Sequence, residues 1–192
     1  AAADAKGKFI VLDRINPIGG QVVDGPIRSG EGNDFVAFHD IPVQHGMTVG
    51  ELARLFRAER QIEVELQVIP VEGWDPSKRL DDSGLPWINP SPNIRSVTEA
   101  MLYPGVGLIE FTNVSVGRGT ITPFEQIGAP WIHEGRLVAR LRKENVPGIL
   151  FLPTRFTPNA SVFDGEDCGG VRFLITDRDK LRPMELGLAL MR

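Results

Sequence analysis

The sequence predicts an α/β protein with a mixed sheet and flanking helices. Segments of strand length alternate along the chain with segments of helical periodicity, which is the pattern of that class. The first segment, Lys8 to Asp13, places an acid after four apolar residues, as in a buried parallel strand whose carboxyl end meets a ligand cleft. A capping box formed by Thr48 and Glu51 marks the start of a helix with one apolar face.

The rest of the first hundred residues combines long loops with one clear strand. Residues 16–34 are rich in turn residues and predict a long loop or a crossover. Residues 62–68 alternate between apolar and polar side chains, which indicates a strand with one wet face. Prolines exclude a regular helix from residues 75–95. A second capping box opens at Ser96, and its short helix is expected to stop before Pro104.

Strands and helices also alternate in the second half. The expected elements are a strand over 107–111, an amphipathic helix over 135–145, strands over 149–156 and 171–176, and a last helix from Pro183. That helix runs to the end of the sequence without a C-cap signal, and the first strand has almost nothing before it. The chain is therefore expected to be an interior piece of a longer protein.

Composition limits the classes of function. The chain has 192 residues, of which 42% are hydrophobic and 24% charged, so it can bury a core. A net charge of −4 without a dense Lys/Arg cluster argues against nucleic acid as a partner. No apolar run approaches the ~20 residues of a membrane span. Cys168 is the single cysteine and no phosphate-binding glycine motif occurs, so neither a metal nor a cofactor is expected.

The segment Leu108 to Thr120, which reads LIEFTNVSVGRGT, is the main candidate for a functional site. Glycines on both sides of Arg118 allow the backbone to approach a ligand closely. Hydroxyls, an amide, a carboxylate and a guanidinium together suit a polyhydroxylated ligand that can carry a negative charge. A solvated loop of the same composition is the alternative. The polar members of the segment are Glu110, Thr112, Asn113, Ser115, Arg118 and Thr120.

Carboxylates at predicted strand ends suggest hydrolysis of a glycosidic bond. Asp13, Glu72 and Glu110 lie at such ends or just beyond them. Glycoside hydrolysis commonly uses two carboxyl groups about 5–9.5 Å apart, one protonated and one ionised. No GxSxG or HExxH motif supports a serine hydrolase or a metallohydrolase.

Aromatic residues in predicted loops fit the same interpretation. Trp74, Trp87 and Trp131 each lie near Pro or Gly, and a flat apolar ring suits one face of a pyranose. Plain loop packing is the alternative for each of them. His45, just before the helix at Thr48, is either a hydrogen-bonded structural residue or part of a site.

A series of longer motifs spans nearly the whole chain. They are Leu12-Asp13-Arg14 with Asn16-Pro17 and Gly19-Gly20; His45-Gly46-Met47-Thr48 with Gly50-Glu51-Leu52-Ala53; Glu72-Gly73-Trp74; Leu85-Pro86-Trp87 with Asn89-Pro90-Ser91-Pro92-Asn93; Glu110 to Thr120; Gly128-Ala129-Pro130-Trp131; and Arg155-Phe156-Thr157-Pro158. In this order the motifs resemble the NamZ-type exo-β-N-acetylmuramidases, a glycoside hydrolase family long described as a domain of unknown function. Ile15 stands where the family usually has a proline.

The resemblance implies release of N-acetylmuramic acid from the non-reducing end of peptidoglycan fragments, in bacterial cell-wall recycling. A non-catalytic domain that binds peptidoglycan sugars is the alternative. The family's architecture implies that residues 1–25 end a Rossmann-like domain and that residues 26–192 form a second α/β domain, truncated at its C-terminus. The family's N-terminal half, with a strong candidate for the catalytic carboxylate, is absent, so this chain alone is expected to be inactive. The resemblance favours an extracytoplasmic location, and the cytoplasm is also compatible.

Site residues follow from the matched motifs. Arg118 is expected to bind the lactyl carboxylate of muramic acid, because a planar guanidinium can hold a carboxylate bidentately. Glu110 is expected to act in the reaction, as general acid/base or as stabiliser of an oxocarbenium-like transition state. Hydrogen bonds to the sugar hydroxyls or the acetamido group are expected from Asn113, Ser115 and Thr120. Further substrate contacts are expected from Asn16, His45, Trp87, Asn89 and Asn93.

Overall fold

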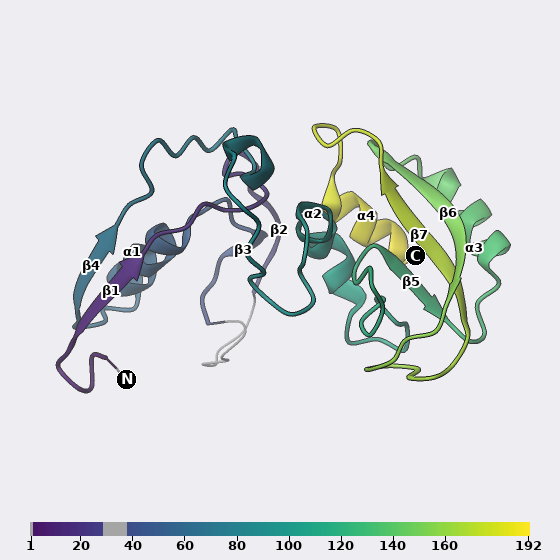
Figure 1. The fold of residues 1–192 in the computed structure, drawn as a ribbon, viewed down its shortest axis with the longest axis horizontal. Helices are drawn as coiled ribbons and strands as arrows, with labels where there is room; N and C mark the ends of the chain where they lie inside the picture. The colour runs from purple at the N-terminus through teal and green to yellow at the C-terminus, as the bar shows by residue number, and fades with distance from the viewer. Residues whose placement is uncertain (1, 29–37) are drawn as a thin grey trace. The chain divides into compact units, whose positions relative to one another are not determined.

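The computed structural model describes residues 2–28 and 38–192, so part of the loop predicted over 16–34 lies outside the described residues. The chain divides into two compact units, residues 1–86 and 87–192 (Figure 1). Parallel and antiparallel strands occur together with helices, which confirms the mixed α/β class. Within the described ranges, no helix is long and apolar enough to cross a membrane.

The first unit is built around a parallel pair of strands. β1 (Lys8–Leu12) pairs with β4 (Glu65–Ile69), and α1 (Val49–Glu59) packs against both strands. β2 (Asp24–Ile27) pairs antiparallel with β3 (Pro42–Gln44) inside a region that the sequence predicts as loop, and a short 3-10 helix covers Leu80–Ser83. The β1–β4 pairing joins residues 8–12 to residues 65–69, and the two compact units separate after Pro86. The domain boundary expected at residue 25 stays a prediction.

Strand β1 is parallel as predicted but is not buried. Val11 is the buried residue of this strand, whereas Phe9, Ile10 and Leu12 are 48%, 53% and 73% exposed. Residues of β1, β4 and α1 line an open apolar cavity of about 540 Å³. The prediction of burial was wrong for these residues because α1 is the helix that packs on this strand pair, and it leaves part of the apolar surface open.

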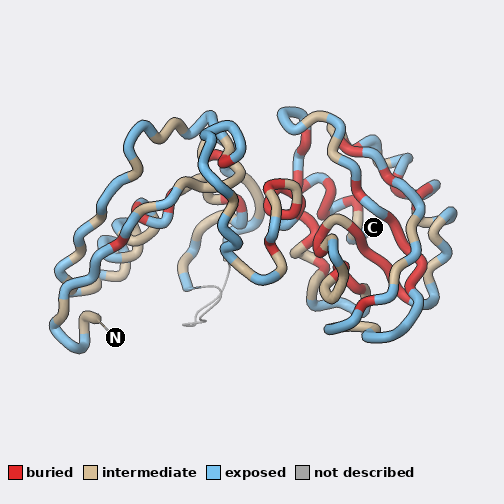
Figure 2. The backbone as a smooth tube through the Cα atoms, in the orientation of Figure 1, coloured by how far each residue is buried: buried red, intermediate tan, exposed pale blue. Residues whose placement is uncertain are grey.

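The second unit contains the main core of the chain. Its sheet has the order β5–β7–β6 and is antiparallel throughout. Helix α3 packs against β6 and β7, and α2 packs against α4 (Figure 1). Figure 2 shows buried residues gathered along these strands and helices. The elements are α2 (Val97–Val106), a 3-10 helix (Gly107–Ile109), β5 (Gln126–Ala129), α3 (Glu134–Leu141), a 3-10 helix (Arg142–Glu144), β6 (Ile149–Phe156), β7 (Cys168–Ile175) and α4 (Pro183–Leu190).

Two predictions in this unit were wrong. Helix α2 continues through Pro104 to Val106, and residues 107–111 form a 3-10 turn and a loop instead of a strand. Pro104 removes a helical hydrogen bond, but full burial of Leu102 and Val106 offsets that cost. A Cβ on Gly105 would meet the carbonyl oxygen of Pro183 at 2.0 Å, so this glycine allows the two helices to pack closely.

Candidate functional site

Glu110 and Arg118 form an ion pair in the second unit. Both lie on the segment that links α2 to β5, and the Arg118 Nε–H donates to Glu110 Oε1. The Glu110 side chain is 13% exposed and that of Arg118 is 31% exposed. Neither terminal amino group of Arg118 donates a hydrogen bond to any of the described residues. The pairing therefore fixes one edge of the guanidinium and leaves the other edge to solvent or a ligand.

Phe124 packs against the Arg118 guanidinium. Its ring centroid lies 5.2 Å from Arg118 Cζ, and the side chain is fully buried. The backbone of Phe124 has φ of 61°, which is a real outlier for a bulky residue and costs about 1–3 kcal/mol. The Phe124 N–H donates to the Val116 carbonyl at 2.8 Å, which helps to hold this conformation. The fold thus places a flat aromatic surface beneath the cation at a cost in stability.

Tyr103 completes this cluster from helix α2. Its ring meets Phe124 edge-on, with centroids 4.9 Å apart, and lies over Gly107, where a Cβ would approach Tyr103 Cε2 to 3.3 Å. Burial raises the pKa of the Tyr103 phenol, and the negative charge of Glu110 adds to the shift, while Arg118 opposes it. Tyr103 and Phe124 were missed from the sequence, because neither an aromatic in a helix nor a positive φ at Phe124 carries a local signal.

The remaining polar residues of the predicted segment mostly shape the loop. Ser115 is buried, accepts the Gly117 N–H at 3.2 Å and joins Gly128 through a pair of backbone hydrogen bonds. Thr120 donates to the Gly117 carbonyl at 2.7 Å and accepts from Gln126 Nε2 at 3.0 Å. Asn113 is exposed. Ser115 and Thr120 therefore have protein partners already, whereas Asn113 remains open to a ligand.

Arg95 and Glu99, at the start of α2, also stabilise this loop. One terminal amino group of Arg95 donates to the Thr120 carbonyl at 2.7 Å. Glu99 is only 2% exposed and accepts the Arg95 backbone N–H. Burial raises the pKa of Glu99, and the bond from Arg95 partly opposes that shift. The predicted capping box is thus half confirmed: Ser96 accepts the Glu99 N–H at 3.1 Å, but the Glu99 carboxylate binds the residue before Ser96.

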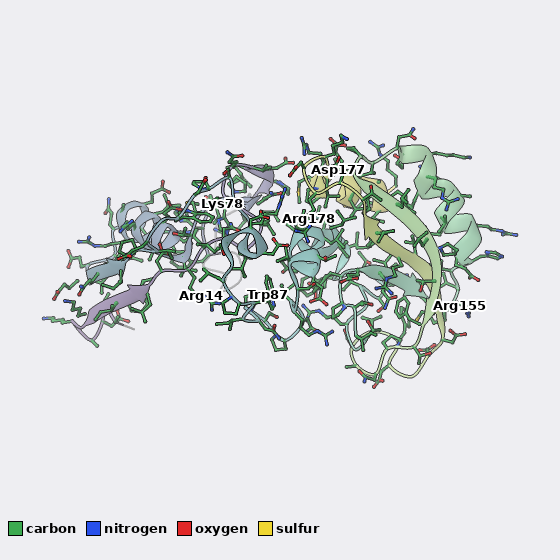
Figure 3. All side chains as sticks on the ribbon, turned by 45° about the horizontal axis from the view of Figure 1, so that its top comes forward. Arg14, Lys78, Trp87, Arg155, Asp177 and Arg178 are labelled. Atoms are coloured by element: carbon green, nitrogen blue, oxygen red, sulfur yellow. The ribbon has the colours of Figure 1, made fainter. Side chains whose placement is uncertain are left out.

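Of the three substrate contacts predicted just before α2, Trp87 and Asn89 contact each other, and Asn93 does not join them. The Trp87 indole N–H donates to Asn89 Oδ1 at 2.9 Å, so these two residues form one polar–aromatic pair. Trp87 lies on the connection to α2 (Figure 3). Asn93 is half-buried, and its backbone N–H donates to Ser91 Oγ at 3.4 Å. The indole N–H of Trp87 is therefore already hydrogen-bonded, and the rest of its ring is apolar.

The first unit holds the other two predicted site residues. Asn16 and His45 both contact Met47: Asn16 Nδ2 donates to its carbonyl at 3.2 Å, and His45 Nδ1 accepts its N–H at 3.1 Å. Burial lowers the pKa of His45, which favours the neutral imidazole that this bond needs. Asp13 accepts from the Thr48 hydroxyl and the Gly50 N–H at 3.0 and 2.7 Å, and so caps α1 instead of standing free for chemistry.

The polar groups of the site are of the kinds that bind sugars and anions. In the described part of the chain, no group of three or more His, Cys, Asp or Glu side chains is placed to hold a metal ion. A guanidinium with one open edge, a paired carboxylate, an exposed amide and a half-exposed phenol can bind a carboxylate and neighbouring hydroxyl groups.

Comparison with known proteins decides the family. The family description "Exo-beta-N-acetylmuramidase NamZ, N-terminal" matches residues 1–98, and its C-terminal counterpart matches residues 101–192. This chain belongs to the NamZ family. The expected resemblance is therefore confirmed, and the family's two parts meet close to the start of α2.

Relatives of the chain are longer than the chain itself. A protein named "Peptidoglycan beta-N-acetylmuramidase NamZ" from Bacillus subtilis (strain 168) is 45% identical over 184 residues, which are 96% of this chain and 44% of that protein. A crystal structure of a DUF1343 family protein from Bacteroides fragilis NCTC 9343 superposes with a TM-score of 0.89 at 33% identity, over 99% of this chain and 50% of that one. A second DUF1343 structure from that organism gives 0.70 at 30% identity, over 93% and 48%. The chain spans about half the length of the relatives it matches.

Proposed function

We propose that the full-length protein is an exo-acting glycosidase that releases N-acetylmuramic acid from the non-reducing end of peptidoglycan fragments, and that Arg118 recognises the sugar. The family membership and the name of the Bacillus subtilis relative support the reaction class. The open edge of the Arg118 guanidinium is the observation on which the substrate assignment rests. Muramic acid differs from glucosamine by a lactyl ether that ends in a carboxylate, and a guanidinium edge matches that group.

In this proposal Glu110 has a supporting role near the reacting bond. Its carboxylate already accepts the Arg118 Nε–H, so it orients the guanidinium and adds negative charge to the site. Such a carboxylate suits stabilisation of an oxocarbenium-like transition state better than proton donation, because a general acid must present its proton to the leaving oxygen. The proton donor is then expected from the part of the full-length protein that this chain does not contain.

The division of the chain supports a two-domain enzyme of which this chain holds a part of each domain. Residues 1–86 would belong to the N-terminal Rossmann-like domain, since β1 and β4 form its kind of parallel pair with α1 alongside. Residues 87–192 would belong to the second α/β domain. On this proposal, Asn113, Arg118, Trp87 and its partner Asn89 contact the sugar from the second domain.

Chromogenic substrates test the proposal with the full-length protein. The 4-nitrophenyl β-glycoside of N-acetylmuramic acid should release nitrophenol, and its N-acetylglucosamine analogue should not. Arg118→Ala should raise KM for the muramic substrate by roughly 10- to 150-fold, the equivalent of a charged hydrogen bond of about 1.5–3 kcal/mol. Arg136→Ala, on the exposed side of α3, is the matched control and should leave KM unchanged.

The alternative, a binding domain without catalysis, gives a different result. The full-length protein would then hydrolyse neither glycoside but would still bind N-acetylmuramic acid in calorimetry, and Arg118→Ala would weaken that binding. Equal losses on muramic and glucosamine substrates in the Arg118 variant would instead contradict the proposed contact with the lactyl carboxylate.

A further inference from the structure

An exposed aromatic pair lies in the second unit, outside the cluster of Glu110, Arg118, Phe124 and Tyr103 (the Arg118 cluster). Trp131 follows β5 in a tight turn closed by the Ile132 N–H on the Ala129 carbonyl at 3.1 Å. Its side chain is 59% exposed, although tryptophan offers the largest apolar surface of any residue. The ring meets Phe163 edge-on, with centroids 5.1 Å apart and an interplanar angle of 86°. The edge contact fixes the orientation of the indole and leaves much of it uncovered.

The loop that carries Phe163 is held in a strained and closed conformation. Ser161 and Phe163 both have positive φ, 72° and 63°, at a cost of about 1–3 kcal/mol each. The Gly165 N–H closes the loop onto the Pro158 carbonyl at 2.9 Å, and the Glu166 N–H bonds the Phe163 carbonyl at 2.9 Å. Packing of a half-buried Phe163 against an exposed Trp131 offsets little of that cost. The strain is better explained as presentation of the aromatic pair to a ligand.

The same loop is anchored to the Arg118 segment. The Asn159 N–H donates to the Gly119 carbonyl at 2.9 Å, and a Cβ on Gly119 would meet the Ala160 nitrogen at 2.5 Å. Gly119 is the neighbour of Arg118, and Phe163 is at most about 14 Å of extended chain from Asn159. This backbone contact therefore attaches the loop of Phe163 to the loop of Arg118.

Charged side chains lie at the end of the sheet next to the turn that carries Trp131. The sheet register aligns Ala129 of β5, Gly169 of β7 and Arg155 of β6 in one row. Arg155 donates to Asp167 at 2.6 Å and to Glu134 at 3.4 Å, and it lies at the sheet of the second unit in Figure 3. A Cβ on Gly169 would stand 3.0 Å from Glu134 Oε2, so the Glu134 carboxylate is held over this row. Trp131 follows this row by two residues along the chain, so the exposed ring and the charged side chains belong to the same end of the sheet. A pyranose, which has an apolar face and a polar rim, matches that combination.

We propose that Trp131 and Phe163 form a second saccharide subsite, which stacks the sugar that follows muramic acid in a peptidoglycan fragment. Glu134, Arg155 and Asp167 supply hydrogen bonds to its rim. This inference rests on the proposed function and adds to it: Arg118 selects the terminal sugar, and the aromatic pair selects a substrate that continues beyond it. The ligand of the subsite is an uncharged N-acetylated pyranose.

Kinetics of the full-length protein separate the two subsites. The substrate is the disaccharide of N-acetylmuramic acid β-linked to N-acetylglucosamine, and free N-acetylmuramic acid serves as a competitive inhibitor that reports on the Arg118 site alone. Trp131→Ala should raise KM for the disaccharide about tenfold and leave the inhibition constant of the monosaccharide unchanged. Trp131→Phe keeps a flat apolar ring and should retain most of the affinity. Leu150→Ala removes an exposed apolar side chain from β6 and should have no effect on either constant.

Each other outcome overturns one of the two proposals. An unchanged KM in Trp131→Ala overturns the subsite, and so does an equal rise of KM and of the inhibition constant, because Trp131 would then act on the first site or on the fold. Thermal unfolding of both Trp131 variants shows whether the fold is intact, and Trp131→Phe remains informative if the alanine variant is unstable. If the unsubstituted protein hydrolyses no muramic substrate at all, the proposed function fails independently of Trp131.

Discussion

The two compact units differ in how completely they bury their apolar side chains. Among the described residues of 1–86, the buried apolar side chains are Val11 and Leu80, and an open cavity of about 540 Å³ runs beside β1, β4 and α1. In residues 87–192, by contrast, Leu102, Phe124 and Leu186 are fully buried. The second unit therefore has a core of its own, while the first has elements whose apolar surface still lacks cover.

Positive backbone φ occurs in both units. Lys6 and Gln61 of the first unit and Phe124, Asn145, Ser161 and Phe163 of the second have positive φ, which costs free energy that the surrounding structure must supply. Such a conformation is least common at bulky side chains. The two aromatic residues in this set, Phe124 and Phe163, belong to the Arg118 cluster and to the Trp131 pair.

Separate expression of the two units gives the largest expected effect. Residues 87–192 should fold alone and show a cooperative thermal transition by circular dichroism, because their core is internal. Residues 1–86 should show no cooperative transition, because buried apolar area is the main stabilising contribution to a domain. The chain of 192 residues is the reference for both. A cooperative transition in residues 1–86 would show that the first unit needs no further cover to fold.

Matched leucine-to-alanine substitutions measure the same difference at single residues. Leu102→Ala removes a side chain with no exposed surface from α2 and should cost about 2–5 kcal/mol of unfolding free energy. Leu66→Ala, on half-buried β4, should cost roughly 1 kcal/mol, because its side chain leaves water only in part. Native-state hydrogen exchange on the 192-residue chain assigns each loss to its unit. Equal losses at the two positions would show that the first unit is packed as tightly as the second.

Local signals in the sequence predicted local structure well. Thr48 and Glu51 form both arms of their capping box, and the alternation over residues 62–68 predicted a strand that the structure has as β4 over residues 65–69. These features depend on contacts a few residues apart. Glu110 and Arg118 were predicted on one Gly-containing segment, and their ion pair is a finding of the structure.

Features that depend on distant contacts were not predictable. The apolar run of β1 shows that the strand needs cover, but no pattern within it tells which residues supply that cover. Residues 107–109 are apolar enough for a strand, and it is the packing of α2 on α4 that makes them continue as a helical turn. Tyr103 reaches Phe124 across 21 residues, and the positive φ of Phe124 depends on its backbone bond to Val116.

Titration of Glu99 should distinguish the second unit by the pH dependence of its stability. Burial raises the pKa of Glu99 from the ordinary 4.5, so the folded state binds its proton more tightly than the unfolded state. That stabilisation is complete below about pH 4.5 and is lost as pH rises through the raised pKa. Glu99→Gln keeps an oxygen for the Arg95 N–H and cannot ionise. Its unfolding free energy in urea, relative to the unsubstituted chain, should therefore increase from about pH 4 to about pH 7, and a constant difference would contradict the role of Glu99.

His45 should give the opposite and smallest effect, in the first unit. Burial lowers its pKa from the ordinary 6.5, so the folded state holds the neutral imidazole, whose Nδ1 accepts the Met47 N–H. This contribution is present above pH 6.5 and is lost as pH falls through the lowered pKa, because the protonated ring can no longer accept that bond. His45→Asn retains an acceptor without a charge in this range. Protection of the Met47 amide from hydrogen exchange should fall below pH 6.5 in the unsubstituted chain and stay level in the variant. If both chains lose protection in parallel, the pH response of the first unit comes from another group, and the contrast between the two units rests on packing alone.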